Sequence, residues 1–327
     1  FVTGADGFIG SHVVGELLLR DIQVTALVQY NSFNTTGWLE SVVPDGNQGL
    51  EVVHGDVRDA GLMRDVMRGH SHVVHLAALI AIPYSYAAPS SYVQTNVVGT
   101  LNVLEACRAN DVERIIHTST SEVYGTAQYV PIDERHPLVG QSPYSASKIS
   151  ADQLAHSFWA SFSAPVVTVR PFNTYGPRQS QRAFIPSVIV QLLSGASKVH
   201  LGSLSPTRDL TFVADTARGF ADVLQSSVGC GRTFNMGSGF EVSMQEVFEL
   251  LCDIGGHEPD LVIDDRRVRP EGSEVERLWS DSSEMSKTFG WAPTYAQGEG
   301  LRRGLEETFD WFRSTSVAGL NPTSYVV

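Results

Sequence analysis

The sequence predicts an α/β fold in which a doubly wound parallel sheet is followed by a smaller C-terminal lobe. Three observations indicate this fold. A glycine-rich loop lies between a short apolar strand and a helix at residues 4–10. Strand-like and amphipathic helical segments then alternate up to residue 170, as in a right-handed parallel sheet with crossover helices. After Pro171 the alternation weakens, so we expect domains at 1–170 and 171–327, with some later segments returning to the first.

The composition favours a globular protein that acts on small molecules. The 327 residues are 42% hydrophobic, enough for one large or two small domains. A net charge of −13 argues against nucleic-acid or anionic-membrane partners. Cys107, Cys230 and Cys252 lack metal-ligand spacing, so we predict no metal site and a reducing compartment. No apolar run approaches the roughly 18 residues of a membrane span, and no signal-peptide pattern is present, so we expect a cytoplasmic protein.

The first element pair predicts dinucleotide binding. Residues 1–3 read as the end of a buried strand and residues 11–20 as a helix with apolar spacing. Between them, Gly4, Gly7 and Gly10 let the backbone turn tightly and approach a pyrophosphate, with the helix N-terminus facing the phosphates. We predict the first half of a Rossmann-type dinucleotide site here.

Three further strands are predicted at 23–28, 51–57 and 72–78. Gln29 follows the first, where an acidic residue would bind the ribose of NAD and an arginine would suit NADP. Neither is present, and the absence of arginine favours NAD. Asp56 could accept from the adenine amino group or be a plain turn aspartate. His75 is expected to be a packed core histidine, and the small residues after it could line the cofactor.

The next segments bring polar residues to one edge of the sheet. A helix is predicted at 92–109, with Asn96 and Thr100 polar on an apolar face, and a strand at 114–119. Thr120, Ser121 and Glu122 follow that strand, at the carboxyl edge where open α/β sheets bind ligands. A helix at 144–163 and a strand at 166–170 complete the first domain.

Tyr144 and Lys148 are four positions apart, so on a helix they lie on one face, one turn from each other. Ser142 is a favourable N-cap and Pro143 a favourable first helical residue. Free tyrosine, with a pKa near ~10, is a poor base, but a neighbouring ammonium group favours its phenolate. The pair therefore predicts a device that moves a proton to and from a substrate hydroxyl.

Beyond Pro171 the elements are shorter. We expect a loop at 172–178, a helix at 184–193 and strands at 207–213 and 233–239. A charged loop at 269–277 and a helix at 301–312 follow. This half is interpreted as a substrate-binding lobe that caps the sheet edge.

Taken together, the residues resemble the extended short-chain dehydrogenases/reductases that act on nucleotide sugars. The resemblance covers nearly the whole chain and rests on Gly4, Gly7, Gly10, Asp56, 76–78, 120–122, Tyr144, Lys148, 170–173, 208–209 and 269–270. Within that class, residues 30–34, 78–86 and 273–275 are most similar to the LegB-type NAD-dependent 4,6-dehydratases of nucleotide-linked N-acetylglucosamine. Glucose 4,6-dehydratases carry Thr-Asp-Glu where this chain has Thr120-Ser121-Glu122, so their aspartate acid is missing here. UDP-glucuronate decarboxylases also carry Thr-Ser-Glu.

The resemblance implies a site and a reaction. It implies NAD as cofactor, with NADP possible, held by Gly4, Gly7, Phe8, Ile9, Gly10, Gln29, Asp56, Val57, Leu76, Ala77, Ala78, Asn96, Tyr144 and Lys148. The catalytic residues implied are Thr120, Ser121, Glu122, Tyr144 and Lys148, and the substrate residues are Asn173, Arg182, Arg208 and Arg269. Tyr144 would deprotonate the sugar 4-hydroxyl, with its pKa lowered by Lys148, and Glu122 would remove the C5 proton. A homodimer built through the helices at 92–109 and 144–163 is also implied.

Three alternatives stay open. A UDP-glucuronic acid decarboxylase needs a cation at the substrate carboxylate, which Arg178 or Arg182 could supply. A simple 4-epimerase has no use for a C5 base such as Glu122. A non-catalytic dinucleotide-sensing protein would have no need of Thr120, Tyr144 and Lys148 together.

Overall fold

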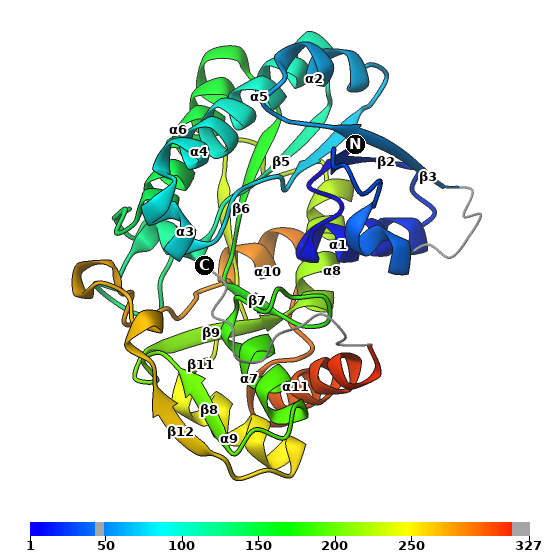
Figure 1. The fold of residues 1–327 in the computed structure, drawn as a ribbon. Helices are drawn as coiled ribbons and strands as arrows, with labels where there is room; N and C mark the ends of the chain where they lie inside the picture. Colours follow the sequence, from blue (N-terminus) through cyan, green and yellow to red (C-terminus); the bar gives the residue numbers. More distant parts are fainter. Residues whose placement is uncertain (43–48, 316–327) are drawn as a thin grey trace.

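Seven parallel strands form the larger lobe of the computed structural model, which describes residues 1–42 and 49–315 (Figure 1). Their order across the sheet is β10-β6-β5-β4-β1-β2-β3. The strands are β1 (Val2–Thr3), β2 (Val24–Gln29), β3 (Leu50–Gly55), β4 (His72–His75), β5 (Arg114–Thr118), β6 (Val166–Pro171) and β10 (Thr233–Met236). The reversal of strand order at β1 and β4 confirms the predicted doubly wound, Rossmann-type sheet.

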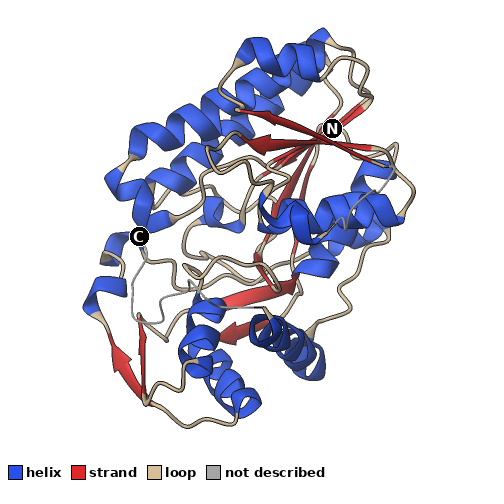
Figure 2. Ribbon diagram, turned by 45° about the vertical axis from the view of Figure 1, so that its right-hand side comes forward, coloured by secondary structure: helices blue, strands red, loops and turns tan. Residues whose placement is uncertain are grey.

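Helices cover both faces of this sheet (Figure 2). One group is α1 (Phe8–Leu19) and α8 (Val213–Gln225), and the other is α2 (Ala60–Val66), α5 (Gly99–Ala109) and α6 (Pro143–Phe162). Because side chains alternate along a strand, adjacent residues enter different cores. Ile116 packs in the cluster of α1 and α8, whereas Ile115 packs in the cluster of α5 and α6. The apolar strands are therefore buried on both sides.

The smaller lobe is built around β9 (Thr207–Phe212), which lies between antiparallel β11 (Glu241–Ser243) and parallel β7 (Asn173–Tyr175). A separate parallel pair joins β8 (Lys198–Leu201) to β12 (Asp260–Ile263). The helices α7 (Phe184–Leu193), α9 (Met244–Gly255) and α11 (Gln297–Ser314) pack on these strands around a third core (Figure 1). Residues 316–327 of the predicted second domain lie outside the described residues.

Some predicted boundaries are wrong. The expected loop at 172–178 contains β7, because Asn173–Tyr175 pairs with β9 and Tyr175 is buried against Phe212. The predicted strand at 72–78 ends at His75. The helix expected at 92–109 is composite: α4 (Pro89–Tyr92) continues through a π-helical segment (Val93–Val98) into α5.

The remaining short elements are α3 (Ile82–Ala87), α10 (Ser283–Phe289) and the 3₁₀ turns Gly37–Ser41, Ser121–Tyr124, Asp265–Arg267 and Glu271–Ser273. A strand from the second half of the chain joins the first sheet, since β10 pairs with β6. Within the described residues, no helix combines the length and apolar character needed to cross a membrane.

Candidate active site

A cleft of about 1320 Å³, here called the main cleft, lies at the carboxyl ends of the sheet strands and is lined by both lobes. It brings together most of the predicted site residues: Gly4, Gly7, Phe8, Ile9, Gly10, Gln29, Asp56, Val57, Leu76, Ala77, Ala78, Thr120, Ser121, Glu122, Tyr144, Lys148, Asn173, Arg182 and Arg269. Two predicted residues, Asn96 and Arg208, do not line it.

The glycine loop forms the floor of one end of the main cleft. Gly4 has a φ of +66°, and a Cβ at Gly10 would lie 2.0 Å from the Gly4 carbonyl oxygen, so neither position tolerates a side chain. Gly7 caps α1 without a side-chain hydrogen bond, and the first turn of α1 has no acidic residue. Its free backbone N–H groups therefore fit the pyrophosphate of a dinucleotide.

Asn96 lies behind the cofactor-facing loop instead of in it. Its Oδ1 accepts from the Leu79 N–H at 2.8 Å, and its Nδ2 donates to the Leu79 carbonyl and to Ser147 Oγ. The side chain is fully buried. Asn96 therefore ties the loop after β4 to α6, and its influence on a cofactor would be indirect.

Asp56 and His75 each form hydrogen bonds with neighbouring residues. Asp56 lines the main cleft, but its carboxylate already accepts from the backbone and guanidinium of Arg58, which lowers its pKa. His75 is buried between Thr3 and Thr100, with its ring nitrogens 2.8 and 3.0 Å from their hydroxyls. The expectation that His75 is a packed core residue is confirmed.

Tyr144 and Lys148 are presented by a well-capped helix. Ser142 Oγ accepts from the Ser145 N–H, and Ser145 Oγ accepts in turn from the Ser142 N–H, a reciprocal capping box. Pro143 is the first helical residue. This start directs the first turn of α6 toward the carboxyl edge of β5.

The 3₁₀ turn after β5 holds the other catalytic candidates. Thr120 Oγ1 accepts from the Glu122 N–H at 3.2 Å and so caps the turn. Ser121 and Glu122 are buried, at 2% and 9% exposure, yet both line the main cleft. Glu122 is thus an enclosed carboxylate near Tyr144 and Thr120, not a solvated loop residue.

The pKa values of Tyr144 and Lys148 are governed mainly by burial. Burial raises the pKa of Tyr144, and its hydrogen bond with Thr120 only partly opposes this. Burial also lowers the pKa of Lys148 to about 8, against the attraction of Asp152. The pKa of Tyr144 is therefore raised by burial and not lowered as predicted, and the Lys148 ammonium donates to the Thr118 carbonyl at 2.7 Å.

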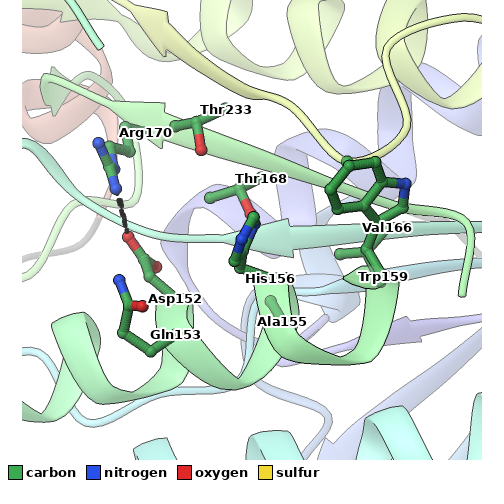
Figure 3. A pocket seen from close by; sticks show the side chains of 10 residues that line it. Asp152, Gln153, Ala155, His156, Trp159, Val166, Thr168, Arg170 and Thr233 are labelled. Carbon is green, nitrogen blue, oxygen red and sulfur yellow. Dashed lines mark hydrogen bonds and ion pairs between the residues drawn. The ribbon is translucent and has the colours of Figure 1, made fainter. Parts of the chain in front are cut away.

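Asp152 fixes the position of α6 one turn beyond Lys148. Its buried carboxylate accepts from His117 Nε2 at 2.9 Å, Ser119 Oγ at 2.8 Å and Arg170 Nη2 at 2.9 Å. Figure 3 shows the Asp152–Arg170 pair at the wall of a smaller cavity of about 260 Å³, away from the predicted site residues. Asp152 thereby joins α6 to β5 and β6 beneath the main cleft.

The substrate candidates are divided between the cleft and the protein interior. Asn173 lines the main cleft, and its buried Oδ1 has no partner within residues 1–42 and 49–315. Arg182 and Arg269 also line it. Arg208 is buried, donates to the Thr207 carbonyl and lies 3.4 Å from Glu274. Its charge acts on Glu122 from behind the cleft wall.

Sequence reasoning missed several cleft residues. Gln179 lines the cleft with a buried Oε1 that has no partner in the described chain. Trp38 and Trp311, from different lobes, meet there with ring centroids 5.3 Å apart. No local pattern indicates Trp38 or Trp311, whereas Gln179 directly follows the predicted loop at 172–178.

The described residues contain no cluster of three or more His, Cys, Asp or Glu able to hold a metal ion. The main cleft places a tyrosine, a lysine, a carboxylate and hydroxyl groups beside the glycine loop.

The sheet order, the glycine loop and the Tyr144/Lys148 pair define an extended short-chain dehydrogenase/reductase. Residues 1–304 match the family model described as GDP-mannose 4,6 dehydratase, and the chain belongs to that family. It is 32% identical to a dTDP-glucose 4,6-dehydratase of Xanthomonas campestris pv. campestris, over 99% of this chain and 96% of the relative.

Solved structures agree with this assignment. The dTDP-glucose 4,6-dehydratase DesIV from Streptomyces venezuelae, solved with NAD bound, matches with a TM-score of 0.87 and 31% identity over 99% of both chains. The UDP-N-acetylglucosamine 4-epimerase from Methanobrevibacter ruminantium M1, in complex with UDP-N-acetylmuramic acid, matches with a TM-score of 0.85 and 30% identity over 96% of this chain and 97% of that one.

Proposed function

We propose that this protein is an NAD-dependent nucleotide-sugar 4,6-dehydratase that acts on nucleotide-linked N-acetylglucosamine. The observation that carries this proposal is Glu122, a buried carboxylate in the same cleft as Tyr144 and Thr120. A dehydratase needs a base for C5 in addition to the tyrosine that acts at C4, and Glu122 is suitably enclosed to be that base.

NAD is the cofactor, as the sequence predicted, since related dehydratases of this fold were solved with it. Gly7 and the open first turn of α1 would hold its pyrophosphate, and Lys148 its nicotinamide ribose. When bound, NAD supplies a hydride acceptor and donor, and the positive charge of its oxidised ring favours a nearby phenolate.

Different residues of the chain carry out the different proton transfers. Tyr144 accepts the proton of the sugar 4-hydroxyl, and Thr120, which hydrogen-bonds with Tyr144, orients that oxygen. Oxidation at C4 makes the C5 proton acidic. Glu122 removes it and passes it to the departing 6-hydroxyl, which leaves as water. Ser121 lies at the position of the aspartate acid of glucose 4,6-dehydratases. Burial of Tyr144, Ser121 and Glu122 limits the access of competing solvent to these groups.

The substrate class is supported by two segments that carry the finer resemblance. Residues 80–84 line the main cleft, and Tyr86 reaches Ser273 with the two hydroxyl oxygens 2.6 Å apart. Residues 78–86 and 273–275 therefore meet across the lobes at the substrate end. A related 4-epimerase is named for UDP-N-acetylglucosamine, which is consistent with an N-acetylated sugar in a cleft of this kind.

The epimerase reading is the second candidate, because one structural relative is a 4-epimerase. An epimerase returns hydride to C4 and needs no base at C5, so Glu122 would have no catalytic role. For a UDP-glucuronic acid decarboxylase, Arg178 was one possible partner of the substrate carboxylate. Arg178 instead donates to Ser11 of α1, on the dinucleotide side of the cleft.

The decisive experiment compares wild-type protein with Glu122→Gln on UDP-N-acetylglucosamine and NAD. Wild type should form a 4-keto-6-deoxy product, detected by absorbance in alkali and by mass, without net NADH. The variant keeps the shape of Glu122 but cannot accept the C5 proton. It should accumulate enzyme-bound NADH and a 4-keto sugar that retains its 6-hydroxyl, and solvent deuterium should no longer enter at C5.

Glu249→Gln, an exposed carboxylate on α9, is the matched control and should behave as wild type. Formation of only the C4 epimer would identify an epimerase, and loss of carbon dioxide from UDP-glucuronic acid would identify a decarboxylase. If UDP-, GDP- and dTDP-linked hexoses all fail to give a 4-keto-6-deoxy product, the dehydratase proposal is wrong.

A further inference from the structure

Arg178 lies where the smaller lobe meets the first turns of α1. Its Nη1 donates to Ser11 Oγ at 3.1 Å, and the neighbouring Pro177 carbonyl is 3.0 Å from His12 Nε2. A carbonyl only accepts, so His12 carries the proton on Nε2. Burial, aided by the charge of Arg178, lowers the pKa of His12 to about 4, so the ring is neutral at physiological pH. Two contacts thus hold Pro177 and Arg178 on α1.

The backbone of this segment is closed into a turn that orients Arg178. Gln179 N donates to the Gly176 carbonyl at 3.3 Å, and Gln179 Nε2 donates to the Thr174 carbonyl at 2.9 Å. Arg178 itself has a φ of +69°, a left-handed conformation that long side chains rarely adopt. Such conformations persist where surrounding contacts impose them, and they concentrate at functional sites.

The charge of Arg178 is not neutralised by the protein. Its side chain is half-buried and lines the main cleft, and no carboxylate pairs with it in residues 1–42 and 49–315. By contrast, Arg58 pairs with Asp56, and Arg269 lies 3.5 Å from Glu274. The adjacent start of α1 is also electropositive, because Gly7 offers no capping side chain and the first turn contains no acid.

We propose that Arg178 binds the pyrophosphate of NAD together with the N-terminus of α1, and that the smaller lobe in this way helps to retain the cofactor. The inference rests on the proposed use of NAD. A guanidinium group can bond two phosphate oxygens at once, whereas the glycine loop offers only backbone donors. Because Arg178 and Gln179 belong to the segment that follows Asn173, the same stretch of chain would contact both cofactor and substrate.

The test measures binding, not turnover. Protein stripped of nucleotide is titrated calorimetrically with NAD, ADP, adenosine and UDP, for wild type, Arg178→Gln and Arg178→Lys. Loss of charge-assisted hydrogen bonds should weaken NAD and ADP binding by about 10- to 100-fold in Arg178→Gln. Adenosine, which has no phosphate, and UDP should bind as to wild type. Arg178→Lys keeps the charge without the fork, so its affinity for NAD should be intermediate.

The control is Arg135→Gln, an exposed arginine outside the main cleft, for which the affinity for NAD should be unchanged. Equal NAD affinity in wild type and Arg178→Gln would overturn the proposal, and so would weaker UDP binding with unchanged NAD binding. If Arg178→Gln does not fold, Arg178→Lys provides the test. Unaltered affinity of Arg178→Lys for NAD and ADP would refute the proposal that Arg178 binds the pyrophosphate. Failure of the dehydratase assay leaves these binding results valid, so the two proposals fail separately.

Discussion

At the scale of single residues, burial affects the pKa values of both Tyr144 and Lys148. Both are buried, which raises the pKa of Tyr144 and lowers that of Lys148 to about 8. Enclosure therefore favours the neutral form of both groups before ligands bind. The proposed transfer of a proton from the substrate hydroxyl to Tyr144 must therefore overcome this effect of burial.

Replacing Tyr144 with phenylalanine tests this role directly. The substitution removes only the phenol hydroxyl group. The variant should therefore fold with a nearly unchanged melting temperature and still bind NAD. Its turnover should fall by roughly 10²–10⁴-fold, the usual size of an acid–base contribution. Tyr129→Phe removes a hydroxyl that bonds Asp133 outside the main cleft and should leave turnover intact. Near-full activity of Tyr144→Phe would refute the assignment.

At the scale of secondary-structure elements, α6 is the helix on which the site depends. Its start is set by the capping box at Ser142, and its depth in the fold is set by Asp152. Burial alone would raise the pKa of Asp152, but hydrogen bonds and charges from His117, Ser119 and Arg170 lower it to about 2, from 3.8. The carboxylate is thus more acidic in the folded protein than in the unfolded chain.

Asp152→Asn should therefore destabilise the protein by about 3 kcal/mol near neutral pH, since Arg170 would lose its buried counter-charge. The stabilisation by Asp152 is complete above its unfolded pKa of 3.8 and is lost as the pH falls toward about 2. The difference in free energy of unfolding between wild type and variant should narrow over that range. Urea denaturation at several pH values measures it.

The control for this experiment is Asp65→Asn, since Asp65 forms an exposed pair with Arg68 and should contribute little. A gap between wild type and Asp152→Asn that stayed constant down to pH 2 would contradict the electrostatic explanation and point to packing instead.

At the scale of the whole molecule, the two lobes share one cleft and touch at more than one place. Trp38 meets Trp311 in the lining of the main cleft, and Tyr86 meets Ser273 outside that lining. On the opposite side of the larger lobe, α4, α5 and α6 lie together at the surface (Figure 1). Val93, in the π-helical segment between α4 and α5, and Phe162, in α6, are 48% and 50% exposed.

We expect those helices to pair with their copies in a homodimer, because exposed apolar residues there exceed what packing on the sheet requires. Light scattering at micromolar concentration should give twice the 35.6 kDa of one chain. Val93→Glu would place a charge in the contact and should shift the protein toward the monomer without changing its fold. A monomeric mass for the wild type would rule the dimer out.

Local sequence is enough to explain the features that depend on neighbours along the chain. The turn at Gly4–Gly10 needs glycine for local steric reasons. The start of α6 follows from Ser142 and Pro143, and the one-turn spacing of Tyr144 and Lys148 follows from helix geometry. The alternation of apolar strands and helices was likewise enough to predict the parallel sheet, as the observed strand order confirms.

Other features depend on residues that are distant in sequence and become visible in the folded chain. β7 forms because Asn173–Tyr175 finds β9, and no local propensity at 172–178 indicates that partner. Asn96 and Arg208 are polar residues in a helix and a strand, and only packing reveals that they lie behind the main cleft. Arg178 reaches Ser11, 167 positions away, because the smaller lobe folds back on α1. Such placements arise from long-range burial and hydrogen bonding, which local sequence patterns do not encode.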